Sequence, residues 1–265
     1  MSALVSVEEL PAVFSGVEDF EITPEGIEVA QATFNEEAIY QAITEMATDW
    51  FRNHGRPARI LDLCSATGLC ALSVSNVIPA ERIVLVDIDA IALDVGMRRH
   101  FAKNTVVTPV CEDAVTYYDG SSYDLILMNS AYHHIENEGK VEFLRNAGVH
   151  LAPGGMLLVG DHFLPPYTHT RYEYRRSVIA FYSDLIRELE KRGESQAAID
   201  VIRRAGLYCW QGTYEYKVCW ERFAADAAAS SLGFAERLPV WFALGATDEC
   251  IVGSAVIRLF SDEQR

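Results

Sequence analysis

The sequence predicts an α/β protein built around a largely parallel β-sheet, and three observations support this prediction. Between residues 58 and 161, short apolar runs alternate with amphipathic stretches, which is typical of parallel strands covered by helices on both faces. The first two apolar runs carry an acidic residue at or near their carboxyl ends, Asp62 and Asp87. After residue 161 the alternation stops, and long helical patterns precede two final β-like runs.

The elements follow one another in a regular order. An amphipathic helix is expected over residues 36–53, with Asn35 as its N-cap and Gly55 just beyond its end. Five strands are expected at 58–63, 82–88, 105–110, 123–129 and 155–161, with helices between them at 69–78, 90–103 and 137–151. Asp89 can cap the second of these helices, and a Pro-Gly-Gly turn precedes the fifth strand.

Residues 162–230 carry helical patterns, whereas 234–245 and 250–260 are β-like and would pair as an antiparallel hairpin at one sheet edge. In an open α/β sheet, ligands bind beyond the carboxyl ends of the strands. A helical insertion that leaves strand five would therefore cover the binding site as a lid. The predicted organisation is an N-terminal helical cap (1–57), a core (58–161 and 231–265) and a lid insertion (162–230).

Composition limits the function. The formal net charge of −16 over 265 residues would repel nucleic acid. The N-terminus lacks the features of a signal peptide, and no apolar run is long enough to span a membrane. The six cysteines are scattered without a C-x-x-C pair, which indicates reduced thiols in a cytoplasmic protein and no metal site. The expected partners are a small-molecule substrate and, at most, a second copy of the chain in a homodimer.

The stretch ILDLCSATG, which ends at Gly68, joins a strand to a helix and differs in spacing from the dinucleotide fingerprint G-x-G-x-x-G. It resembles the D/E-x-G-x-G-x-G loop of the class I S-adenosylmethionine (SAM) methyltransferases, with Cys64 and Ala66 in place of two glycines. A plain strand–helix turn is the alternative. The resemblance implies cofactor contacts at Asp62, Cys64, Ser65, Ala66 and Gly68.

Two further acidic positions fit the same family. Asp87 ends the second strand, where a carboxylate can accept two hydrogen bonds from a ribose diol, and Ile88 follows it. The stretch VCEDAVTY resembles the family's adenine-binding signature, which implies adenine contacts from Asp113 and Ala114. Glu112 is the alternative acid.

The fourth and fifth strands complete the resemblance. YDLILMNSAYHHIE resembles the fourth-strand motif of small-molecule methyltransferases, which implies that Asn129 and Ser130 lie beside the methionine part of SAM. LAPGGMLLVGD resembles the family's turn before strand five. The motifs span residues 58–161 in the family's order and imply a Rossmann-like class I methyltransferase sheet with SAM as the cofactor.

In such enzymes the cofactor carries an activated methyl group, and the protein aligns an acceptor and removes its proton where needed. The candidate bases are His133 and His134, just past strand four. Asp161 and His162 end strand five, and Tyr172 belongs to an aromatic stretch that could close over a sulfonium. Helix capping by the histidines and packing by the aromatic residues are the structural alternatives.

The resemblance implies methyl transfer to a small-molecule acceptor, such as a specialised metabolite in a biosynthetic pathway. Two alternatives remain open. One is a different attack on SAM, by aminocarboxypropyl transfer or internal cyclisation, which would release methylthioadenosine. The other is a non-catalytic SAM-binding partner subunit. The sequence does not determine whether carbon, nitrogen or oxygen accepts the methyl group.

Overall fold

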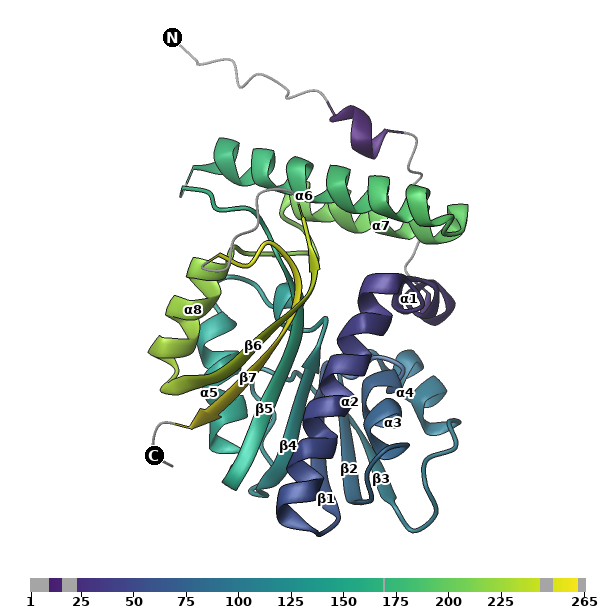
Figure 1. Ribbon diagram of the computed structural model, residues 1–265, viewed down its shortest axis with the longest axis vertical. Helices are drawn as coiled ribbons and strands as arrows, with labels where there is room; N and C mark the ends of the chain where they lie inside the picture. Colours follow the sequence, from purple (N-terminus) through teal and green to yellow (C-terminus); the bar gives the residue numbers. More distant parts are fainter. Residues whose placement is uncertain (1–9, 16–22, 169, 244–249, 262–265) are drawn as a thin grey trace.

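The computed structural model describes residues 10–15, 23–168, 170–243 and 250–261, and it contains a seven-stranded sheet (Figure 1). The strands lie in the order β3-β2-β1-β4-β5-β7-β6, and β7 runs antiparallel to both of its neighbours. The strands are β1 Ala58–Leu63, β2 Ala80–Asp87, β3 Val106–Cys111, β4 Tyr123–Asn129, β5 Leu151–Phe163, β6 Leu232–Phe242 and β7 Gly253–Ser261. The prediction of a largely parallel α/β sheet with an antiparallel C-terminal pair is confirmed.

Helices cover both faces of the sheet, because alternate residues of each buried strand point to opposite sides. In β1, Leu61 and Leu63 pack in the cluster that contains residues of α5 and α8, whereas Ile60 packs in the cluster of α2 and α3. The helices are α1 Pro24–Gln31, α2 Phe34–His54, α3 Leu69–Ser75, α4 Ala90–Met97, α5 Lys140–Val149, α6 Arg171–Arg192, α7 Gln196–Gln211 and α8 Trp220–Ala229. None of these described helices is long and apolar enough to cross a membrane.

Some boundaries differ from the sequence prediction. Helix α4 ends at Met97, well before residue 103, and Arg99 turns back so that its Nε donates to the carbonyl oxygen of Thr67 at 2.5 Å. Strand β5 begins at Leu151, so the Pro-Gly-Gly stretch lies within it, where the register against β4 shifts. The prediction that Asn35 caps α2 is wrong, because Thr33 is the N-cap and Asn35 lies buried in the first turn.

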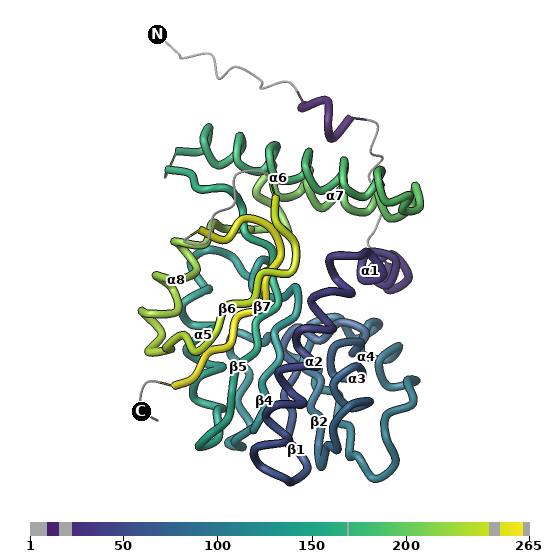
Figure 2. Tube along the Cα trace, viewed as in Figure 1, coloured from purple at the N-terminus to yellow at the C-terminus, as the bar shows by residue number. Residues whose placement is uncertain are grey.

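Helices α6 and α7 form a separate layer beyond the carboxyl ends of the parallel strands, as the ribbon and the Cα trace both show (Figures 1 and 2). We call this pair the α6–α7 layer. It has its own apolar cluster, which includes Phe181 and Leu185 of α6, Leu207 of α7, and Phe14 of the 3-10 helix η1 (Ala12–Phe14). Helix α1 also contacts α7. The N-terminal segment therefore reaches the layer that covers the sheet edge.

Helix α8 does not belong to this layer. It packs against α5 and β6, and its Trp220 and Phe223 are part of the same apolar cluster as β1, β4 and β5. The range 162–230 thus divides into the α6–α7 layer over the sheet edge and a helix that covers the sheet face.

Candidate functional site

A cavity of about 760 Å³ lies between the carboxyl ends of the parallel strands, the α6–α7 layer and α1. Its volume falls within the range of small-ligand sites. Most of the site residues expected from sequence line it: Asp62, Cys64, Ser65, Ala66, Asp87, Ile88, Asp113, Ala114, Asn129, Ser130, His133, His134 and His162. Side chains of α1, α6 and α7 complete its wall.

The loop between β1 and α3 turns through three residues in the left-handed region. Cys64, Ala66 and Gly68 have φ angles of 55°, 46° and 70°. A Cβ atom on Gly68 would lie 3.1 Å from Cδ1 of Leu85, so glycine is needed there for space as well as for conformation. The two positions where the resembling family has glycine thus keep a glycine-like backbone here, at about 1 kcal/mol of strain each.

Two acidic residues hold the strand ends beside this loop. Asp87 accepts hydrogen bonds from the backbone N–H groups of Ala66 (2.7 Å) and Asp89 (2.8 Å), and Asp89 caps α4 as the sequence predicted. Asp113 accepts a bond from Val115 N at 2.9 Å. Both carboxylates also border the cavity, so each can accept further hydrogen bonds from a ligand.

Burial changes the protonation of two loop residues. Burial raises the pKa of Asp62 to about 8, although its bond from Ala71 N opposes this change. Burial also raises the pKa of the Cys64 thiol far above its usual range, and nearby carboxylates add to this effect. Cys64 is therefore a thiol at neutral pH and provides no thiolate nucleophile.

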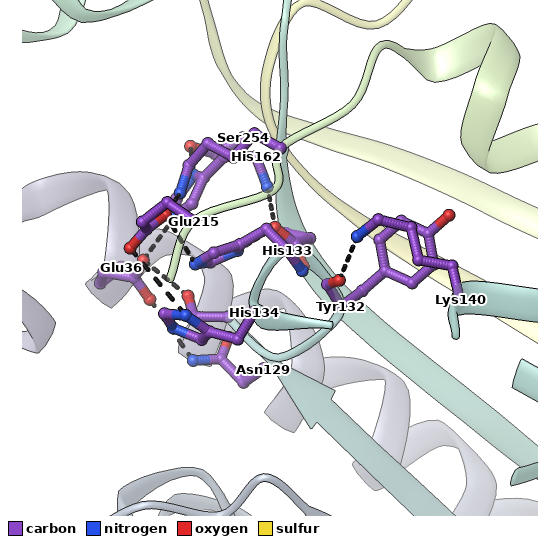
Figure 3. A network of polar contacts seen from close by, with 12 residues as sticks. Glu36, Asn129, Tyr132, His133, His134, Lys140, His162, Glu215 and Ser254 are labelled. Atoms are coloured by element: carbon purple, nitrogen blue, oxygen red, sulfur yellow. Dashed lines mark hydrogen bonds and ion pairs between the residues drawn. The ribbon is translucent and has the colours of Figure 1, made fainter. Parts of the chain in front are cut away.

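A buried polar cluster occupies the ends of β4, β5 and α2 (Figure 3). Glu36 lies 2.6 Å from Nε2 of His162 and 2.9 Å from Oγ of Ser130, and its second oxygen lies 3.4 Å from Nδ2 of Asn129. Nδ1 of His162 lies 2.8 Å from the hydroxyl of Ser254. Burial alone would raise the pKa of Glu36, but His162 and these donors lower it, so Glu36 carries a negative charge at neutral pH.

His133 and Asp161 form a close pair in the 3-10 helix η2 (Tyr132–His134) and β5. Nδ1 of His133 lies 2.6 Å from Oδ1 of Asp161, whose other oxygen accepts from the backbone N–H of His133 at 3.2 Å. Burial lowers the pKa of His133 to about 4 despite the opposing carboxylate. Burial would raise the pKa of Asp161, but His133 holds it well below its usual range. At neutral pH a neutral His133 therefore donates Nδ1–H to an ionised Asp161.

Glu215 and Lys217 complete the wall beside His133. Oε2 of Glu215 lies 2.5 Å from Nζ of Lys217 and 3.5 Å from Nε2 of His133, and both charged residues are buried. The 213–219 segment turns Lys217 inward against Glu215. Burial opposes the charge of Lys217, but Glu215 raises its pKa, so the pair is ionised.

Sequence analysis also expected no metal-ligating cluster. Within the described residues, however, His133, His134 and Glu215 each offer a ligand atom, and these atoms lie within 4.8 Å of one another. Glu215 is far from the histidine pair in sequence, so no local spacing signalled the group.

Three expected site residues lie outside the cavity lining. Gly68 lies in the loop next to Leu85, and Asp161 contacts Nδ1 of His133. The assignment of Tyr172 to the site is wrong, because its side chain is 62% exposed and packs under Arg176 on the outer surface of α6. In contrast, Glu36 and Glu215 were missed, because neither belongs to a motif.

Within the part of the chain that the structure describes, five cavity residues keep a buried polar atom without a hydrogen-bond partner. They are Gln31 (Oε1), Asn35 (Oδ1), Ser65 (Oγ), Asn129 (Oδ1) and Tyr182 (Oη). Unpaired buried polar atoms are unfavourable and rare in folded proteins. Their concentration in one cavity indicates a polar ligand that supplies the missing bonds.

Comparison with known proteins agrees with this geometry. Residues 60–155 match the family described as "Methyltransferase domain". The malonyl-[acyl-carrier protein] O-methyltransferase of Bacillus cereus is 34% identical over 100 residues, which are 38% of this chain and 36% of that protein. The tRNA1(Val) (adenine(37)-N6)-methyltransferase of Aeromonas hydrophila is 35% identical over 80 residues, 28% of this chain and 32% of that protein. The chain thus spans about a third of the length of the curated relatives it matches.

Among solved structures, a SAM-dependent methyltransferase from Clostridium acetobutylicum aligns with a TM-score of 0.56 at 10% identity, covering 84% of this chain and 92% of that one. At this identity the likeness concerns the fold alone. Residues 60–155 thus resemble a methyltransferase domain, and the seven-stranded sheet has the fold of a SAM-dependent methyltransferase.

Proposed function

We propose that this chain binds SAM and transfers its methyl group to a small-molecule acceptor, such as a specialised metabolite. The observation that carries the proposal is a single cavity with two different walls. One wall is the left-handed loop with Asp87 and Asp113, and the other contains His133, oriented by Asp161. The first wall fits a nucleoside, and the second fits an acceptor that must lose a proton.

The polar atoms of the cavity fit SAM. The unpaired amide oxygens of Gln31, Asn35 and Asn129 need N–H or O–H donors, which an ammonium group and a ribose diol supply. The negative charge of Glu36 beside Asn129 favours a cationic ligand. We infer that Asp87 would bind the ribose. The rest of the cofactor would be held by four groups of residues. They are Asp62, the loop residues Cys64, Ser65, Ala66 and Gly68, the residues Ile88, Asp113 and Ala114, and the strand-end residues Asn129 and Ser130.

When bound, SAM supplies a methyl group on a positively charged sulfur, so that the acceptor atom forms the new bond to carbon while the carbon–sulfur bond breaks and the sulfur keeps the electron pair. The acceptor's proton goes to Nε2 of His133. That nitrogen carries the lone pair because Nδ1–H is held by Asp161. His134 is the alternative base. His162 is held between Glu36 and Ser254 and therefore positions the polar cluster.

The acceptor is proposed to be small for two reasons. Residues of α1, α6 and α7 line the cavity beyond the strand ends, so we propose that the α6–α7 layer acts as a lid. The net charge of −16 opposes an RNA acceptor such as that of the tRNA methyltransferase relative. The six cysteines are scattered through the chain without a C-x-x-C pair, which fits reduced thiols, and we infer a cytoplasmic location.

The proposal is tested by incubating the purified protein with SAM and a metabolite extract and identifying the products by mass spectrometry. Formation of S-adenosylhomocysteine together with a product heavier by one methylene unit supports methyl transfer. Release of methylthioadenosine instead would replace the proposal with cleavage or cyclisation of the SAM side chain. SAM that binds without turnover would indicate a partner subunit.

The base is tested with His133→Ala, with the exposed His100→Ala as a control. Since general-base catalysis contributes about 10²- to 10⁴-fold, His133→Ala should lower kcat/KM by that factor, and His100→Ala should leave it unchanged. A full loss in His134→Ala with normal activity in His133→Ala would transfer the role to His134.

A further inference from the structure

Three side chains of the acceptor wall combine the ligand types that a divalent transition metal prefers. His133, His134 and Glu215 all line the cavity, and their ligand atoms lie within 4.8 Å of one another (Figure 3). Two imidazoles and one carboxylate form a set that suits iron, manganese, cobalt or zinc. Nε2 of His133 lies 3.5 Å from Oε2 of Glu215, and Nδ1 of His134 lies 4.0 Å from Oε1 of the same carboxylate.

The neighbours of the two histidines orient them as metal ligands are oriented. Nδ1 of His133 lies 2.6 Å from Asp161, and Nδ1 of His134 lies 3.0 Å from the carbonyl oxygen of Tyr214. The ring of His133 therefore donates Nδ1–H to Asp161 and keeps its lone pair on Nε2, which lies 3.5 Å from Oε2 of Glu215. Metal-binding histidines almost always have their second nitrogen engaged in this way.

The carboxylate is held as well. Lys217 binds Oε2 of Glu215 at 2.5 Å, which leaves Oε1, the oxygen nearer His134, for a further partner. Glu215 and His133 are 5% and 4% exposed, so little bulk water competes for them. A buried ion pair such as Glu215–Lys217 contributes little to folding stability. We therefore infer that the pair serves the binding of a ligand in the cavity.

We propose that His133, His134 and Glu215 bind one divalent transition-metal cation whose open coordination positions face the acceptor half of the cavity. Three protein ligands with an open position are typical of a catalytic rather than a structural metal site. Only the consequence for the reaction rests on the proposed function. With the cation bound, Nε2 of His133 would be a ligand. The cation would lower the pKa of an acceptor group bound at an open position, and that group would then lose its proton to water instead of to His133.

Cation binding is tested without SAM or acceptor, by isothermal titration of chelator-treated protein with Mn²⁺. This ion prefers oxygen ligands to the soft sulfur of cysteine, so the cysteine side chains compete little for it. We expect saturable binding of one equivalent, weakened more than tenfold in His134→Ala and in Glu215→Gln. The matched control His100→Ala should bind as the wild type does. Unchanged circular dichroism and SAM binding in the variants establish that they are folded.

Lys217→Met provides a second measurement, because removal of the ammonium group from Glu215 should tighten Mn²⁺ binding several-fold. No saturable binding, or equal binding in all variants, overturns the cation site. Formation of S-adenosylhomocysteine is the measurement that separates the cation site from the proposed methyl transfer. Turnover that persists in chelator without Mn²⁺ binding leaves methyl transfer standing and overturns the cation site. Stoichiometric Mn²⁺ binding without SAM turnover supports the cation site and overturns the proposed methyl transfer.

Discussion

At the residue scale, the loop after β1 keeps a left-handed backbone at two positions that carry side chains. Ala66 has a φ of 46°, which an L-residue with a Cβ atom adopts at a cost of about 1–2 kcal/mol. We therefore expect Ala66→Gly to raise the free energy of unfolding by about 0.5 kcal/mol, since the relief of strain exceeds the entropy that glycine adds to the unfolded chain. Urea denaturation measures the change.

The matched control is Ala32→Gly. Ala32 is exposed at the end of α1 and has a φ of −87°, so glycine there adds unfolded-state entropy without relieving strain. It should lower stability by about 0.5–1 kcal/mol. If Ala66→Gly loses as much stability as Ala32→Gly, the strain at Ala66 has been overestimated.

The buried carboxyl group of Asp62 determines the sign of one contribution to the pH dependence of folding stability. Its pKa is about 8 in the folded protein and about 4 in the unfolded chain, so between these values the native state binds more protons. Stability from this group is therefore complete at low pH and falls as pH rises, by up to about 1.4 kcal/mol per pH unit. The isosteric Asp62→Asn should remove this slope, so its stability relative to wild type should grow between pH 5 and 8. Parallel pH profiles would contradict the assignment.

At the element scale, the junction of α6, α7 and η1 depends on one glycine. A Cβ atom on Gly206 would lie 2.4 Å from the ring of Phe14 and 2.9 Å from that of Tyr182. Gly206→Ala should therefore lower stability by about 1–3 kcal/mol through overpacking. Gly148→Ala in α5 is the control, because its Cβ atom would meet only a leucine methyl at 3.4 Å. That variant should gain about 0.5 kcal/mol from helix propensity, and thermal unfolding should show the opposite signs.

The elements that sequence predicted well are those with a local pattern. The strands from β1 to β5 and the loop residues beside them follow each other within residues 58–161, so hydrophobic runs and turn residues were sufficient. Glu36 and Glu215 were not predictable in this way. Each reaches the cavity because a helix start or a connecting segment from elsewhere in the chain is folded against the sheet edge.

At the scale of the whole molecule, the cavity is lined by segments far apart in sequence, and one residue connects the loop after β1 to them. Arg99, beyond the end of α4, binds the carbonyl oxygen and the hydroxyl of Thr67 in the loop and pairs with Glu28 of α1. Helix α1 in turn packs against α7. A conformational change in the loop at Thr67 is therefore expected to affect helices α1 and α7.

This coupling predicts how SAM binding spreads through the protein. SAM at 100 times its Kd stabilises the bound state by about 2.7 kcal/mol, and the Arg99 contacts should carry part of this to α1 and α7. Hydrogen–deuterium exchange in both helices should therefore slow on SAM addition, more than in α5 on the opposite sheet face. In Arg99→Met, the residues beside Thr67 should still be protected by SAM, whereas α1 should exchange at its ligand-free rate. Equal protection of α1 in the wild type and the variant would show that the covering helices close independently of Arg99.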